Sequence, residues 1–219
     1  MSDVLTRLAG LDSCAVSDAL DKLGLAGAVA GIHRLSTDRR ISGRVVTVKL
    51  DRDDHAGRPA ASRHLGTTAI EASQPGDVIV VEQRTGIDAA GWGGVLSLGA
   101  SLKGIAGVII DGPSRDVDEA RVHDFAVFAR DHTARTARGR IVETGTNVPV
   151  TVGDIPVAPG DFVVADGSAV VFVRAQDIDR VLDAAEAIAA REAGMADSLR
   201  AGTPITQVMG KNYETMLRK

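Results

Sequence analysis

The stretch GVII at residues 107–110 is the feature that most limits the fold of this chain. It is a continuous apolar run of strand length, which is typical of a central strand covered on both faces. Residues 89–103 before it form a Gly-rich turn that runs into a helix of small residues, and residues 111–120 lead through a turn into another helix. Strands that alternate with helices in this way predict an α/β fold.

Composition narrows the choice of core residues. Aromatic residues are only 3% of the chain, whereas 24 of its 219 residues are glycine. The core must therefore be built from Val, Ile, Leu and Ala, and the Gly-rich turns suit a backbone that needs positive φ or close approach. The length suits one compact domain. Since no low-complexity linker divides residues 1–219, we expect a single domain with a C-terminal arm at about residues 199–219.

Charge and cysteine content exclude several classes of protein. Lys and Arg number 25 against 29 Asp and Glu, a formal charge of −4 without a dense basic run, which argues against a nucleic-acid partner. Cys14 is the only cysteine, so there is no disulfide framework, and we expect it to be a small buried residue. The start lacks a signal-peptide pattern, and no stretch is long and apolar enough to span a membrane. These features predict a cytoplasmic protein with no membrane partner.

Local patterns predict the other elements. Apolar residues at helical spacing predict a helix over residues 15–25, with Ser13 or Ser17 as its cap and Gly24 at its end. A second helix is predicted over residues 175–193. The strands expected from β-branched and apolar runs cover residues 45–48, 78–81, 126–128, 148–152, 162–165 and 170–173, with the last two joined as a hairpin.

The candidate chemistry lies within residues 91–116. Ligands of open α/β sheets bind outside the carboxyl ends of the strands, and here the strand at 107–110 is followed by Arg115 and Asp116. The Gly-rich turn at residues 91–94 opens a helix whose first N–H groups favour an anion such as a carboxylate. Arg115 offers a two-pronged donor for a carboxylate or enolate, and Asp116 offers an oxygen ligand for a hard cation such as Mg²⁺.

Each of these residues also has a plainer interpretation. Asp116 with Glu119 three residues later fits a helix cap with its reciprocal carboxylate, which is the commoner reason for such an Asp. Arg115 fits a surface salt bridge, and Gly93 with Gly94 fits a simple turn. Their occurrence together at one strand end makes a ligand site an equal alternative.

The histidines and the single tryptophan give little further indication of function. The five histidines are scattered without the spacing of a zinc site. His55 and His64 lie in a polar loop before Gly66, from which one of them could reach the distal part of a substrate. Trp92 lies among glycines, where it either packs the turn or forms an apolar wall of the pocket.

The run GWGGVLSLGASLKGIAGVIIDGPSRDVDEA at residues 91–120 resembles the RraA-like family, which includes the 4-hydroxy-4-methyl-2-oxoglutarate aldolases. The resemblance extends to residues 15–32 and 147–166, and so covers most of the chain. Its most specific element is a strand followed by D-G-x-x-R-D, matched here by Asp111, Gly112, Arg115 and Asp116.

This resemblance implies a fold and an activity. The fold would be a three-layer α/β/α sandwich with a swivelling β/β/α core, assembled as a homotrimer or as a hexamer made of two trimers. The activity would be that of a class II, metal-dependent pyruvate aldolase with oxaloacetate decarboxylase activity. Its substrate would be a 4-hydroxy-2-oxo acid, and its cofactor Mg²⁺ or Mn²⁺.

The resemblance also implies roles for particular residues. Asp116 would bind the metal and Arg115 would contact the substrate. A Glu from the C-terminal helix of a neighbouring subunit would complete the site, and Glu192 is the candidate. Backbone donors to the pyruvoyl end of the substrate would come from the turn, at Gly93, Gly94, Val95 and Leu96.

The implied chemistry is enolate stabilisation. Retro-aldol cleavage and decarboxylation of a β-keto acid both leave an electron pair on C3 of a pyruvoyl unit, which is tolerable only as an enolate. A divalent ion and the charge of Arg115 would stabilise that oxyanion. No Schiff base is needed, in keeping with three lysines that we expect at the surface or at strand edges, Lys22, Lys49 and Lys103.

One position departs from the family pattern. Many family aldolases have Glu or Asp in the turn where this sequence has Gly94, and that carboxylate would help to hold the metal's waters. Its absence leaves two alternatives open beside the named reaction. The chain could be a lyase acting on a different oxo acid, or a non-catalytic regulator like the family members that bind an RNA-degrading endonuclease.

Overall fold

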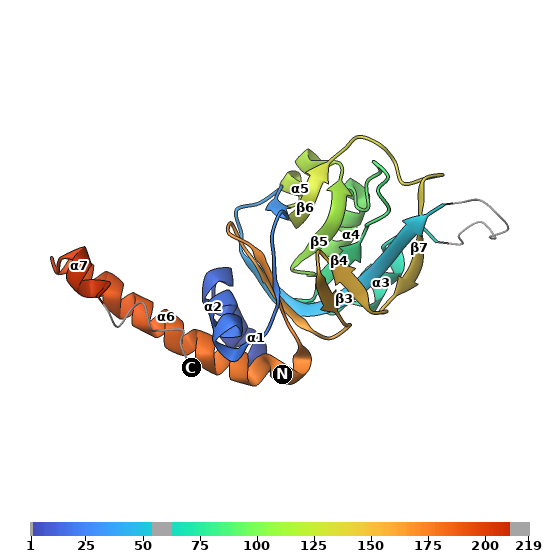
Figure 1. The fold of residues 1–219 in the computed structure, drawn as a ribbon. Helices are drawn as coiled ribbons and strands as arrows, with labels where there is room; N and C mark the ends of the chain where they lie inside the picture. Colours follow the sequence, from blue (N-terminus) through green and yellow to red (C-terminus); the bar gives the residue numbers. More distant parts are fainter. Residues whose placement is uncertain (1, 54–62, 211–219) are drawn as a thin grey trace.

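Nine strands form one curled mixed sheet in the computed structural model, which describes residues 2–53 and 63–210 (Figure 1). The strands of this sheet are β1 (Ala28–Val29), β2 (His33–Arg34), β3 (Ile41–Arg52), β4 (Val78–Glu82), β5 (Gly107–Ser114), β6 (Ala126–His132), β7 (Ile141–Thr146), β10 (Phe162–Ala165) and β11 (Val170–Val173). A separate hairpin is formed by β8 (Val150–Val152) and β9 (Ile155–Val157). The helices are α1 (Ser2–Ala9), α2 (Ser13–Leu23), α3 (Thr67–Ala72), α4 (Gly94–Leu102), α5 (Val117–Val122), α6 (Ile178–Arg200) and α7 (Ile205–Val208).

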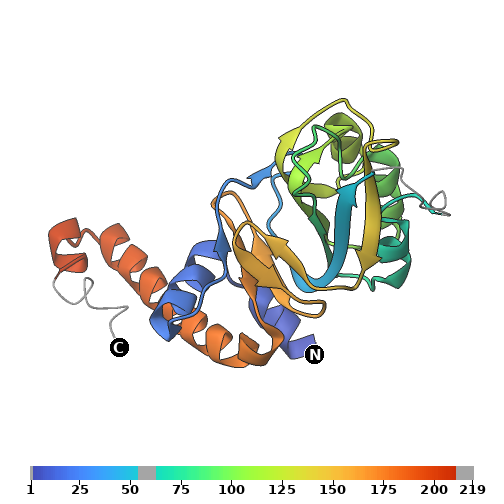
Figure 2. The same cartoon turned by 45° about the vertical axis from the view of Figure 1, so that its right-hand side comes forward.

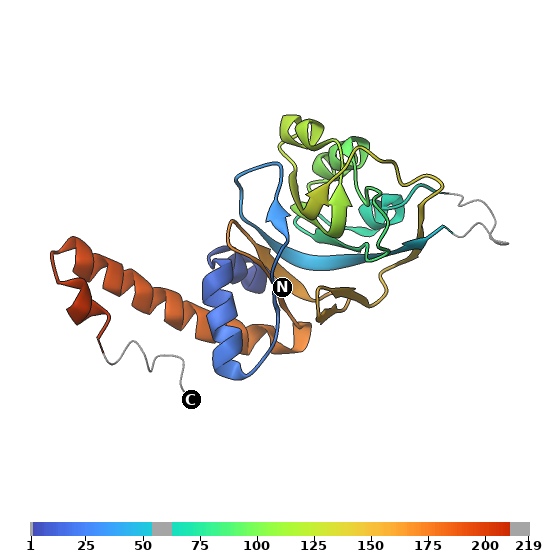
Figure 3. The ribbon, with the colours of Figure 1, turned by 45° about the horizontal axis from the view of Figure 1, so that its top comes forward.

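The long strand β3 connects the two halves of the sheet (Figure 3). It pairs in parallel with β4, and the parallel order continues through β5 to β6. The first residues of β3 pair antiparallel with β10, whereas its last residues pair antiparallel with β7. Because β4, β5 and β6 are parallel, their carboxyl ends lie at the same edge, where ligands of such sheets bind.

The central strands are buried on both faces, as the apolar run at residues 107–110 predicts. Val108 and Ile110 of β5 lie in a core shared with α4 and α5. Ile109 points to the opposite face, where it belongs to a core shared with the β8–β9 hairpin and β10. A third core packs α1, α2 and α6 against β10 and β11. Helices therefore lie on both outer sides of a β-rich centre, which agrees with the predicted α/β/α sandwich and its β/β/α core.

Most predicted elements are present, some with the predicted boundaries and some longer or shorter. The strands predicted at residues 78–81, 162–165 and 170–173 correspond to β4, β10 and β11, and the last two form the predicted hairpin. β5 continues beyond residue 110 to Ser114. The helix predicted over residues 175–193 starts with a 3₁₀ turn and reaches Arg200.

Two predictions around α2 are wrong. Neither Ser13 nor Ser17 caps this helix, because Asp12 precedes it and accepts a hydrogen bond from the Ala15 N–H at 2.8 Å. Cys14 is exposed rather than buried, since it lies on the face of α2 that points away from the core. The predicted end at Gly24 is confirmed, with φ of 67° in the left-handed region that glycine adopts easily.

The C-terminal helix α6 has two different halves (Figure 2). Its first half packs on α2 and β11 through apolar residues that end at Ile188. Its second half projects from the body of the protein, and α7 follows it. The arm predicted at residues 199–219 is described only to residue 210, so residues 211–219 lie outside the described part. Within the described ranges, none of the helices combines the length and apolar character needed to cross a membrane.

Candidate functional site

Backbone hydrogen bonds join the Gly-rich turn to the end of β5. The Gly91 N–H donates to the carbonyl oxygen of Pro113 at 2.9 Å, and the Arg115 N–H donates to that of Trp92 at 3.1 Å. These bonds place the first turn of α4 beside the start of α5. Arg115, Asp116 and residues 93–96 consequently line the same cavity.

The carboxylate of Asp116 does not cap its own helix. Asp116 has φ of 55° and ψ of 41°, in the left-handed region, and its side chain makes no capping hydrogen bond to α5. Its Oδ2 instead accepts from the Gly94 N–H at 3.0 Å and from the Arg115 Nε–H at 3.0 Å. The capping interpretation is therefore wrong, and the salt bridge of Arg115 lies within the cavity wall rather than on a remote surface.

The N-terminus of α4 presents the other polar groups of this wall. Gly93, the residue before the helix, has no side chain to cap it, and the Gly94 N–H donates to Asp116 instead. Gly94 is thus not a free donor in this structure. Val95 and Leu96 belong to the first turn, where N–H groups have no acceptor within the helix and favour an anion.

Glu119, for which the sequence predicts only a role in capping, lies against the first residue of α4, although it does not line the cavity. The carboxyl carbon of Glu119 lies 2.7 Å from the position that a Cβ atom on Gly94 would occupy. A carboxylate from α5 therefore covers the glycine whose amide binds Asp116. The spacing of Asp116 and Glu119 on one face of a helix was the available signal, but the contact with Gly94 depends on how α4 and α5 pack.

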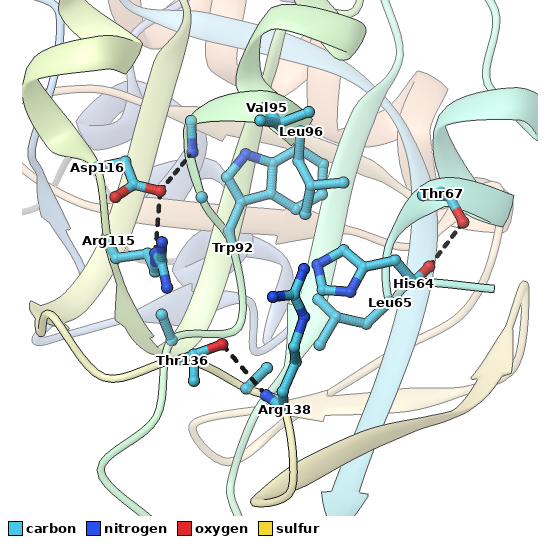
Figure 4. A pocket seen from close by; sticks show the side chains of 14 residues that line it. His64, Leu65, Thr67, Trp92, Val95, Leu96, Arg115, Asp116, Thr136 and Arg138 are labelled. Atoms are coloured by element: carbon cyan, nitrogen blue, oxygen red, sulfur yellow. Dashed lines mark hydrogen bonds and ion pairs between the residues drawn. The ribbon is translucent and has the colours of Figure 1, made fainter. Parts of the chain in front are cut away.

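The cavity has a volume of about 390 Å³ (Figure 4). Asp116 and Arg115 lie on one side of it, and His64 and Arg138 lie on another. The lining is completed by residues of the α3 and α4 starts and of the segment before β7, namely Leu65, Thr67, Ala90, Trp92, Gly93, Gly94, Val95, Leu96, Thr136 and Ala137.

His64 reaches the cavity, whereas His55 lies outside the described residues. Partial burial and the positive charges of Arg138 and Arg115 hold the pKa of His64 below its ordinary value of 6.5. The imidazole is therefore neutral at pH 7, and can donate one hydrogen bond and accept another.

Trp92 packs the turn and also contributes to the cavity wall. Its side chain is almost fully buried, stacks on Phe125 with ring centroids 6.3 Å apart, and donates from Nε1 to the hydroxyl of Ser97 at 3.1 Å. Both interpretations of this residue from the sequence thus apply in part. The ring fixes the Gly-rich turn over the sheet.

The first carboxylate of the D-G-x-x-R-D element has a different environment. The Asp111 side chain is buried, and it accepts from Arg130 Nε at 2.6 Å and from the Gly153 N–H at 2.7 Å. Arg84 Nε lies 3.7 Å from Asp111 Oδ2, the oxygen that also accepts from Gly153. Asp111 therefore ties β5 to β6 and to the turn of the β8–β9 hairpin, and it does not line the cavity.

Comparison with known proteins settles the family. A family model for RraA-like proteins, described as Aldolase/RraA, matches residues 13–172. The chain belongs to the RraA-like family. The family resemblance and the fold class predicted from the sequence are thereby confirmed.

Individual RraA-like relatives are distant in sequence. "Protein DlpA" of Legionella pneumophila is 26% identical over 208 residues, which are 94% of this chain but 33% of that protein, so this chain spans a third of its length. "Putative 4-hydroxy-4-methyl-2-oxoglutarate aldolase" of Halalkalibacterium halodurans is 28% identical over 154 residues, covering 69% of this chain and 67% of that protein. The crystal structure of an uncharacterized protein from Pseudomonas syringae pv. tomato matches with a TM-score of 0.85 at 28% identity, covering 96% of this chain and 98% of the other.

Glu192, the residue expected to act from a neighbouring subunit, is exposed on the projecting half of α6. Within one RraA-like chain this half lies on the opposite side of the molecule from α4 and α5 (Figure 1). The structure therefore does not bring Glu192 to its own Asp116. Its contribution across a subunit boundary stays a prediction.

The acidic residues of this RraA-like site suit a hard divalent cation. Asp116 Oδ2 accepts two hydrogen bonds, while Oδ1 makes none to the described residues. Glu119 also has no hydrogen bond or ion pair from its carboxylate within the described ranges, and no cluster there offers three or more His, Cys, Asp or Glu side chains to a metal. Mg²⁺ usually keeps several waters and binds through one or two carboxylates. Asp116, which lines the cavity, fits the role of one such ligand, while Glu119 lies against Gly94 without lining the cavity.

Proposed function

We propose that this chain is a divalent-metal-dependent lyase. It cleaves a 4-hydroxy-2-oxo acid of the 4-hydroxy-4-methyl-2-oxoglutarate type to pyruvate by a retro-aldol reaction, and it also decarboxylates oxaloacetate. The observation that carries this proposal is the Arg115–Asp116 pair at the N-terminus of α4, inside a cavity of substrate size. The name of the H. halodurans relative supports it.

The residues of the chain stabilise the negative charge that both reactions generate. In the retro-aldol reaction the 4-hydroxyl group loses its proton to solvent and becomes the carbonyl group of the second product, whereas decarboxylation releases CO2. In both reactions the bonding electron pair stays at C3 of the pyruvoyl unit and its charge moves to the oxygen on C2. Uptake of a proton from solvent at C3 then gives pyruvate. The guanidinium of Arg115, which is held by Asp116, provides a fixed positive charge for that oxygen. The first N–H groups of α4, at Val95 and Leu96, bind the adjacent carboxylate of the substrate.

Asp116 and Glu119 would hold the cation. When bound, Mg²⁺ or Mn²⁺ supplies Lewis-acid stabilisation of the enolate oxygen. Asp116 contributes the oxygen that is free of hydrogen bonds, and Glu119 contributes the second carboxylate, which family aldolases take from the turn. Gly94 is compatible with this arrangement because its missing side chain leaves room for Glu119.

Pyruvate release tests the proposal. We expect release from 4-hydroxy-4-methyl-2-oxoglutarate and from oxaloacetate with Mg²⁺, loss of release with EDTA, and recovery when Mg²⁺ is added in excess. Because metal ions alone promote oxaloacetate decarboxylation, Asp116→Asn protein with the same Mg²⁺ is the matched control. Full activity in EDTA would refute the mechanism. No release from any four- to seven-carbon oxo acid would refute the lyase and favour a regulator that acts by protein contact.

A further inference from the structure

We propose that Arg138 is the residue that binds the distal carboxylate of the substrate, so that the site selects oxo acids with two carboxylates. This inference rests on the proposed function, because it takes the Arg115–Asp116 side of the cavity as the place of the pyruvoyl unit. It adds a specificity residue that lies far from the D-G-x-x-R-D element in the sequence.

Arg138 is the second arginine that lines the cavity. Arg115 is paired with Asp116 at 3.0 Å, and the nearby Arg135, outside the cavity, is paired with Asp88 at 3.4 Å. The guanidinium of Arg138 has no ion pair or hydrogen bond with the residues that the structure describes, although the side chain lines the cavity. A free guanidinium at a pocket wall is complementary to a planar anion, which it can bind through two parallel hydrogen bonds.

His64 accompanies Arg138 on that wall. Figure 4 places the guanidinium of Arg138 beside the imidazole of His64, away from the Arg115–Asp116 pair, and the influence of Arg138 on the pKa of His64 agrees with this proximity. A neutral imidazole can donate one hydrogen bond to a carboxylate that Arg138 holds. The two side chains therefore form a second polar end of the cavity.

The wall between the two ends is mainly apolar. Leu65 and Leu96 line it, together with Val95, whose side chain is largely exposed. The arrangement suits a ligand with an anionic group at each end and a short carbon skeleton between them. Charge agrees with this geometry: with a divalent cation bound, the two arginines and the two carboxylates leave two net positive charges, which a dianion neutralises.

Binding of two unreactive probes tests the inference. The probes are 2-oxoglutarate, which has a distal carboxylate, and 2-oxopentanoate, which has a methyl group in its place; neither carries the 4-hydroxyl group that cleavage requires. With Mg²⁺ present, we expect wild-type protein to bind 2-oxoglutarate about 10- to 100-fold more tightly by calorimetry, the usual effect of a charge-assisted hydrogen bond. Comparable affinity for both probes would overturn the inference without any variant.

Variants then assign the effect to one residue. Arg138→Gln is expected to remove most of the preference, and Arg138→Lys to retain part of it, because an ammonium keeps the charge but not the two-pronged geometry. Arg135→Gln, on the same segment but outside the cavity, is the matched control and should keep the preference. Oxalate binding, which needs only the Arg115 end, verifies that each variant is folded. An unchanged preference in Arg138→Gln protein would assign the effect elsewhere and refute the proposal.

The outcomes separate this inference from the lyase function. If no oxo acid releases pyruvate but the preference exists and depends on Arg138, the distal site stands and the lyase proposal fails. If pyruvate is released with equal kcat/KM from 4-hydroxy-2-oxoglutarate and from 4-hydroxy-2-oxopentanoate, the lyase stands and the distal site fails.

Discussion

The carboxylate of Glu119 fills the space that a side chain on Gly94 would need, with the Glu119 carboxyl carbon 2.7 Å from the ideal Cβ position. The amide of the same glycine donates to Asp116 at 3.0 Å. One residue without a side chain thus contacts both acidic groups of the proposed cation site. In the proposed function, a carboxylate from α5 takes the place of an acidic residue at position 94.

Exchange of the acidic group between positions 94 and 119 tests this explanation. We expect Gly94→Ala to displace the Glu119 carboxylate and to weaken Mn²⁺ binding by about 10-fold or more, the usual range for groups that support a metal site. Stability should change little, because Glu119 is exposed and its end can move. The double variant Gly94→Asp with Glu119→Ala should recover binding, which paramagnetic resonance of Mn²⁺ would measure. Unaltered Mn²⁺ affinity in Glu119→Gln protein would contradict the role of Glu119.

Asp116→Asn should lower catalytic activity without lowering the stability of the fold. Asn tolerates the left-handed backbone of position 116, at φ 55°, whereas Ala there would add strain of about 1–2 kcal/mol. We therefore expect Asp116→Asn to lower kcat at least about 100-fold and to abolish Mg²⁺ binding. The thermal midpoint should stay close to that of the wild type, while Asp116→Ala lowers it further. Retained metal-dependent turnover in Asp116→Asn protein would remove Asp116 from the mechanism.

Asp111→Ala, in contrast to Asp116→Asn, should mainly lower the stability of the fold. This substitution leaves Arg130 and the Gly153 N–H without their buried acceptor, for which we expect a loss of about 2–4 kcal/mol in the free energy of unfolding. The matching fall in Tm is about 5–15 °C by calorimetry. Asp118→Ala, which removes an exposed ion pair with Arg121, is the control and should change stability by less than about 1 kcal/mol. A stable but inactive Asp111→Ala protein would mean that this residue acts in the reaction.

Local sequence patterns predict structural features that depend on residues close together in the sequence. The apolar run at 107–110 is sufficient for a central strand, and Gly24 is sufficient to end α2. The direction of the Asp116 side chain is different, because it depends on a left-handed backbone that the sequence does not mark. Likewise, the D-G-x-x-R-D pattern does not distinguish the buried Asp111 from the cavity residue Asp116.

The other features that the sequence did not predict depend on packing between segments far apart in the chain. Glu119 reaches Gly94 only because α4 and α5 pack side by side. His64 and Arg138 are far apart in the sequence. The end of β3, which precedes His64 in the chain, pairs with the start of β7, which follows Arg138, and both residues line the same cavity. The sequence indicates His64 as a possible contact to the distal part of a substrate, but no periodicity or spacing connects it with Arg138, so the pairing of the two was not predictable from the chain alone.

The titration of His64 gives a test that is independent of activity. Partial burial and the charges of Arg138 and Arg115 lower its pKa below 6.5, so the unfolded chain binds this proton more readily than the folded protein. Folding stability attributable to His64 is therefore complete above pH 6.5 and declines as the pH falls below that value. By NMR titration, we expect Arg138→Gln to raise the pKa of His64, and 2-oxoglutarate to raise it in the wild type. A pKa that neither change moves would place Arg138 away from the imidazole.

Glu192 provides the final prediction, because a residue on the projecting half of α6 can reach a cavity only in another subunit. We expect a homotrimer or a hexamer by light scattering, and reduced kcat in Glu192→Gln protein without loss of the assembly. Asp116→Asn and Glu192→Gln proteins should each be impaired alone. When the two are unfolded and refolded together, mixed assemblies should regain activity, since some sites then combine an intact Asp116 with an intact Glu192 from the neighbouring subunit. Activity that never exceeds the mean of the separate variants would show that Glu192 does not complete the neighbour's site.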